Sequence, residues 1–116
     1  MNHALGVINN YRASNGLGPL ALAGDATAKA QQHADDMAGQ GNIFHSGSLS
    51  DGISDGWTAL GENVGVAGSF DQVEGMFQNS SSHRANLLSG SYNQVGIGLA
   101  WGGDGQLYVT EDFVGR

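Results

Sequence analysis

The chain has 116 residues, of which 40% are hydrophobic and only 13% are charged, so it holds apolar material for one modest core. Eleven Asp and Glu against four Lys and Arg give a formal net charge of −7, and the few cations are widely spaced, which argues against nucleic-acid binding. No apolar run approaches the roughly 20 residues of a membrane span, and the absence of Cys excludes disulfides and thiolate chemistry. We therefore expect a single domain over residues 1–116, with no transmembrane segment.

Apolar spacing predicts three helices in the first two thirds of the chain. The first covers residues 2–14. The second runs from about 25 to 38, with Asp25 as its N-cap and a stripe of small side chains that lets a neighbouring layer approach closely. Ser69 and Gln72 fit a capping box for the third, whose predicted buried face consists of Phe70, Val73, Met76 and Phe77. A short helical turn over 83–88 follows.

The last quarter of the chain changes to the alternation typical of strands. Residues 94–101 and 107–114 are predicted to form an antiparallel hairpin around a glycine-rich turn. Gly96 and Gly98 lie inside the first strand, where they permit close packing by the opposing layer. Helices followed by a hairpin indicate an α+β protein, and the polar residues 45–56 are expected to form a mobile surface loop.

Two of the four histidines stand where a regular element meets a polar loop, a common place for functional side chains. His45 is followed by Ser46, and His83 follows a run of serines; for each, a functional and a structural role stay open. His33 is expected to be a packed helix residue. His3 lies at the N-terminal end of the first predicted helix. The sequence has no two histidines four residues apart on a helix, so short-range spacing gives no sign of a metal site.

Acidic residues supply the partners that such histidines need. Glu62 lies in an apolar, small-residue segment, which predicts a partly buried carboxylate bonded to a His or a backbone N–H. Glu111 and Asp112 alternate in orientation, so at most one faces a shared site, and we expect both to be solvated. Ser80 to Ser82 are expected to cap the short helix rather than to supply a nucleophile.

Taken together, these segments resemble the CAP superfamily (cysteine-rich secretory proteins, antigen 5 and pathogenesis-related 1), also called SCP domains, in a short cysteine-free bacterial form. The matching segments, in chain order, are Ile8–Arg12, Pro19–Leu20, Ala30–Ala38, Phe44–Ser46, Gly61–Val64, Phe77–Ser80, His83–Leu88, Val95–Gly98 and Tyr108–Phe113.

The resemblance implies a three-layer α-β-α sandwich with a central, mainly antiparallel sheet. It also implies a cleft formed by His45, Glu62 and His83, with His45 and His83 as metal ligands. In many eukaryotic members a second Glu follows an aromatic residue of the third helix by three positions; here Phe77 takes the aromatic place and Ser80 the acidic one.

We therefore expect a secreted or cell-envelope bacterial CAP domain that acts as a ligand-binding module. Its cleft would bind Zn²⁺ or another divalent cation weakly, because two His provide fewer ligands than catalytic zinc sites use. An adjacent groove would take a small lipid or a peptide, and the expected state is a monomer. The chain opens without a signal peptide, so the expectation of export rests on the resemblance. The alternative is a metal-assisted hydrolase or peptidase that uses the same cleft.

Overall fold

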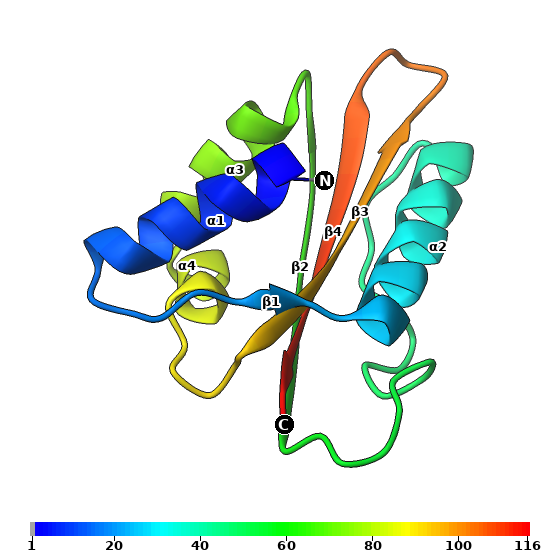
Figure 1. Cartoon of the computed structure of the whole chain (residues 1–116). Coiled ribbons are helices and arrows are strands. Elements are labelled where there is room, and N and C mark those ends of the chain that lie inside the picture. The colour runs from blue at the N-terminus through cyan, green and yellow to red at the C-terminus, as the bar shows by residue number, and fades with distance from the viewer. Residues whose placement is uncertain (1) are drawn as a thin grey trace.

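A computed structural model describes residues 2–116; Met1, which the predicted domain includes, lies outside them. The helices are α1 (Asn2–Ser14), α2 (Gly24–Gln40), α3 (Phe70–Gln78) and α4 (Ser81–Leu87), and the strands are β1 (Ala21–Leu22), β2 (Ala59–Ala67), β3 (Gln94–Trp101) and β4 (Leu107–Gly115). The sheet has the order β1-β3-β4-β2, and only β1 runs parallel to its neighbour. One face is covered by α1, α3 and α4 and the other by α2 (Figure 1), which confirms the predicted α-β-α sandwich. In the described residues no helix has both the length and the apolar character needed to cross a bilayer.

Two details of the predicted helices are wrong. Helix α2 begins at Gly24 with Ala23 as its N-cap, because the carboxylate of Asp25 is engaged elsewhere. It pairs with Arg116 at 2.8 Å and accepts a bond from Ser54 N, and these contacts lower the pKa of Asp25 to about 2. Met76 of α3 was predicted to be buried but is 54% exposed, and Glu74 is buried on that face of the helix instead.

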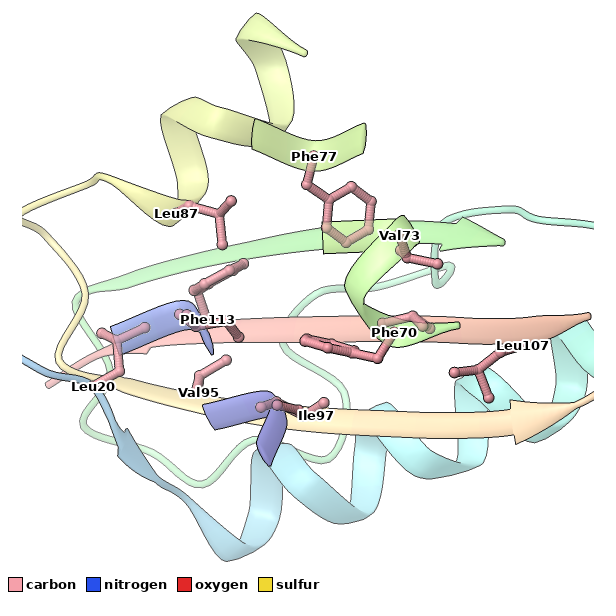
Figure 2. Close-up of a cluster of buried hydrophobic side chains, with 12 residues drawn as sticks. Leu20, Phe70, Val73, Phe77, Leu87, Val95, Ile97, Leu107 and Phe113 are labelled. Carbon is pink, nitrogen blue, oxygen red and sulfur yellow. The ribbon is translucent and has the colours of Figure 1, made fainter. Parts of the chain in front are cut away.

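The larger apolar core lies between the sheet and the three-helix layer. Figure 2 shows Phe70, Val73 and Phe77 of α3 and Leu87 of α4 above side chains of β3 and β4. Ile97 and Phe113 are almost fully buried there. This layer holds α4, and therefore His83, against the sheet.

On the opposite face, α2 lies directly on β3 because both surfaces lack side-chain bulk. A Cβ atom added at Gly96 would collide with the backbone of Ala26, and one added at Gly98 would collide with the backbone of Ala30. The small-residue stripe of α2 is buried at these positions. The close packing expected at the two strand glycines is therefore confirmed.

A pair of carboxyl groups is buried between α3 and β4. Glu74 is 1% exposed and Glu111 is fully buried, and Asn63 Nδ2 donates to Glu111 Oε1 at 3.3 Å. Burial and the neighbouring Glu74 raise the pKa of Glu111 well above its ordinary value, so the pair shares a proton. The expectation of a solvated acid at Glu111 is wrong, because this residue faces the helix layer.

The glycine contact predicts a large effect from one methyl group. Gly98→Ala should lower the free energy of unfolding by more than about 2 kcal/mol, because backbone rather than a flexible side chain blocks the new Cβ. Chemical denaturation monitored by circular dichroism measures this. Gly103→Ala in the hairpin turn, where a Cβ meets nothing within 4 Å, is the control. Equal stability of the two variants would contradict the close approach.

The buried acid pair predicts a pH-dependent stability. Because the pKa of Glu111 is raised in the fold, its protonated form stabilises the protein fully below pH 4.5, and this contribution is lost as pH rises toward the raised pKa. Glu111→Gln should increase the free energy of unfolding at pH 8 by about 1–3 kcal/mol and flatten its fall with pH. Denaturant titrations between pH 4.5 and 8 test this, with Asp55→Asn in the exposed loop as control. A variant as pH-sensitive as the native chain would disprove the shared proton.

Candidate functional site

The centre of the site is the carboxylate of Glu62, whose side chain is only 1% exposed although it lies on β2, an edge strand of the sheet. His45 Nδ1 lies 3.0 Å from Glu62 Oε1. Ser46 donates its backbone N–H to the same oxygen at 2.9 Å and its hydroxyl to Oε2 at 2.7 Å. Glu62 was predicted to bond either a His or a backbone N–H, and it bonds one of each, His45 and the Ser46 N–H.

The position of His45 follows from the end of α2. Gly41 ends that helix in the left-handed conformation, at φ 68°, and the chain turns back toward the sheet. The His33 ring bonds the carbonyl oxygen of Phe44 and packs edge-on against the Phe44 ring, so His33 is a packed helix residue as expected. His33 thus fixes the residue directly before His45.

Asp112 lies behind Glu62 on the neighbouring strand β4, as its cross-strand partner. Burial and the adjacent Glu62 raise the pKa of Asp112 to about 9, so this carboxyl keeps its proton and donates it to Glu62. Burial alone would raise the pKa of Glu62, but the bonds from Asp112, Ser46 and His45 outweigh it and lower that pKa to about 2. Asp112 was expected to be solvated; it is 3% exposed because it faces α2 rather than solvent.

His83 is held on the other side of β2 by residues of α3 and α4. Its Nδ1 lies 2.8 Å from Ser80 Oγ, and its ring stacks on Phe77 with centroids 4.8 Å apart. Burial and the nearby His45 lower the pKa of His83, which favours the neutral imidazole. Ser80 is the N-cap of α4, but its hydroxyl makes no capping bond.

The two histidines flank consecutive residues of β2. His45 contacts Glu62, while the carbonyl oxygen of His83 accepts a bond from Asn63 Nδ2 at 3.2 Å. Asn86 of α4 joins the two sides, because its Nδ2 donates to Glu62 O at 3.3 Å and to Asn63 Oδ1 at 2.9 Å. Glu62 bonds His45 but not His83.

The donor set limits what the site can hold. In residues 2–116, no group of three or more His, Asp or Glu side chains is arranged to hold a metal ion. Both oxygens of Glu62 are occupied by donors, so this residue orients His45 and is not free to act as a ligand. What remains is two imidazoles, each with its Nδ1 engaged and its Nε2 free of any protein hydrogen bond in the described part of the chain.

Sequence reasoning missed Asp112, Asn63 and Asn86 as supports of the site. The signal that could have found Asp112 is strand alternation, which places it on the face opposite to Glu111. Arg84 has a structural contact, since it donates to the Gln78 carbonyl oxygen at 3.1 Å.

Two hollows meet at His45 and Ser46. One of about 740 Å³ lies between α2 and the segment 44–52, and its walls include Lys29, Gln32 and Asp36. The other, of about 450 Å³, lies over the edge of β2 and is lined in part by Leu49, Leu60, Asn86 and Tyr92. The loop expected to be mobile is tied to α2, because Lys29 Nζ donates to Ser48 O at 2.7 Å.

Several solved structures share this fold. An outer surface protein of Borrelia burgdorferi superposes with a TM-score of 0.89 at 17% identity, over 100% of this chain and 92% of its own. An extracellular SCP-domain protein of Bacillus anthracis gives 0.84 at 23% identity over 100% of this chain, and a cysteine-rich secretory protein of Staphylococcus aureus gives 0.82 at 22% over 98%. The chain spans only 40% and 37% of the length of the last two.

Two further comparisons concern the sequence itself. No curated protein matches the chain. The family model of the cysteine-rich secretory protein (CAP) family matches residues 5–113, a segment that contains His45, Glu62, His83 and all of the sheet except the last two residues of β4. The chain therefore belongs to the CAP family.

Proposed function

We propose that this CAP domain is a secreted or cell-envelope ligand-binding module that holds a divalent cation, with Zn²⁺ as the best fit, through the Nε2 atoms of His45 and His83. The supporting observation is that each ring has its Nδ1 engaged within the protein, at Glu62 and at Ser80. A second-nitrogen contact of this kind is the usual way in which proteins orient metal-binding imidazoles.

The protonation states of the site suit such binding. With a pKa of about 2, Glu62 is a carboxylate and can only accept, so His45 Nδ1 carries the hydrogen and Nε2 is the ring nitrogen left for a cation. The lowered pKa of His83 keeps that ring neutral near pH 7. A cation therefore competes with few protons at neutral pH and with more as the pH falls.

Two nitrogen ligands favour weak and exchangeable binding. A catalytic zinc usually has three protein ligands, and a structural one has four. Ser80 bonds His83 instead of offering a carboxylate. The remaining positions would be left for water or for a donor atom of a bound molecule.

The larger hollow favours a peptide over a lipid as this molecule. Its walls carry charged and amide side chains, among them Lys29, Gln32 and Asp36, which match the polar groups of a peptide better than an acyl chain. The solved extracellular proteins with the same fold support a location outside the cytoplasm.

Zinc titration tests the cation part of the proposal. Isothermal calorimetry at pH 7.5 should show saturable binding to the native chain, and His45→Ala and His83→Ala should each weaken it by about tenfold or more. His3→Ala is the matched control, because His3 is an exposed histidine paired with Asp71 on another part of the molecule. Binding that is absent, or that falls equally in all three variants, would refute the site. A repeat at pH 5.5 should show weaker binding.

The bond between His45 and Glu62 also favours a second function, since an imidazole oriented by a carboxylate is the arrangement of a general base. A hydrolase that uses this pair would cleave peptide or ester substrates in a Zn²⁺-dependent manner. We expect no such turnover from a binding module. Turnover by the native chain that disappears in both His45→Ala and His83→Ala would replace the binding function by a hydrolytic one.

A further inference from the structure

The outer edge of β3 is only partly covered by other strands. Gly102 N donates to Gln106 O in the register of the β3–β4 ladder, so even-numbered residues of β3 bond β4 and odd-numbered ones direct their backbone groups outward. Strand β1 pairs only with Gln94 and Val95, and Ala23 N donates to Val95 O. Beyond this point no strand within residues 2–116 accompanies the outer edge of β3.

One side chain takes the place of the missing strand. Gln31 Nε2 of α2 donates to Leu99 O at 2.8 Å, and Leu99 N donates to Gln31 Oε1 at 3.1 Å. The carboxamide thus offers the same donor and acceptor as a peptide group in a neighbouring strand. It reaches the edge because Gly98 lets α2 lie directly on β3.

Strand β3, whose outer edge Gln31 covers at Leu99, has the features of an edge strand that pairs with other strands. Residues 94–101 contain no charged residue and no proline, and Trp101 at its end is 64% exposed. Edges of this kind promote pairing between chains unless they are blocked. An antiparallel alignment centred on Leu99 would pair Ile97 of each copy with Trp101 of the other, so the edge is complementary to itself.

We propose that Gln31 is a latch that closes the outer edge of β3 against antiparallel pairing with the same edge of a second copy of this chain. This surface lies apart from the proposed cation site and does not depend on it. With the latch closed, the Leu99 backbone groups are satisfied within one chain. With the latch open, a second copy satisfies them and covers Trp101.

Gln31→Ala and Gln32→Ala form a matched pair for the test. Both glutamines donate to an aspartate four residues later on α2, at 3.0 Å in each case, but only Gln31 contacts β3. In Gln31→Ala at low protein concentration, the Leu99 amide should exchange its hydrogen about tenfold faster or more, as followed by NMR. Gln32→Ala should leave that rate unchanged.

Sedimentation measures the second half of the proposal. Gln31→Ala should form dimers as its concentration rises, while the native chain and Gln32→Ala should not. Adding Trp101→Lys to Gln31→Ala should restore the monomer, because a charge at this position opposes edge pairing. Where Gln31→Ala does not fold, Gln31→Met is assayed in its place; it keeps the length of the side chain and loses both the acceptor for Leu99 N and the donor for Leu99 O. Unchanged exchange at Leu99, or faster exchange without dimers, would overturn the proposal.

Discussion

A buried carboxylate on an edge strand requires donors, and this requirement at Glu62 organises the site. The free energy cost of burying a charge must be offset by hydrogen bonds or by an opposite charge. Ser46 supplies two of them and His45 a third, all from the segment that follows α2. These bonds, together with those of His33 to Phe44 O and of Lys29 to Ser48 O, set the path of this segment across the sheet edge. The orientation of the His45 ring follows from its bond to Glu62.

Two adjacent acids of β4 support the two sides of the site. Asp112 points toward the α2 layer and keeps Glu62 ionised, while Glu111 points toward α3 and accepts a bond from Asn63. Asn63 in turn donates to the carbonyl oxygen of His83. Each histidine is thus connected through one residue of β2 to one acid of β4. Both acids hold protons in their buried settings, so the arrangement adds little charge to the interior.

The elements with strong periodicity could be predicted from the sequence, and the short or irregular ones could not. The bounds of α1 and β3 agree with the predicted ones, because their apolar spacing is regular. Strand β2 was not predicted as a strand: its glycines and polar residues break the alternation, and its pairing with β4 comes from a distant part of the chain. The two-residue strand β1 is too short to leave a pattern.

The site shows the same division between local and distant information. The residues His45, Glu62 and His83 were singled out from their settings and from the family resemblance, but their supports were not. Asp112 and Glu111 were expected in solvent because sequence alone does not show that β4 is the central partner of both β2 and β3. Glu74 occupies the buried position that was expected for Met76 for the same reason: the acid next to it, Glu111, lies 37 positions later in the chain.

The replacement of an acid by Ser80 changes the charge of the site as well as its ligand count. A divalent cation bound as proposed would meet one negative charge, at Glu62, because Ser80 is neutral and Asp112 keeps its proton. The bound cation would then keep a net positive charge facing the hollows on either side of His45. Such a centre attracts an anionic group into its remaining coordination positions, and a carboxylate at the end of a peptide carries one. Under the proposed function, a serine in place of an acid at this position would therefore favour the binding of a ligand at the cation over tight retention of the cation itself.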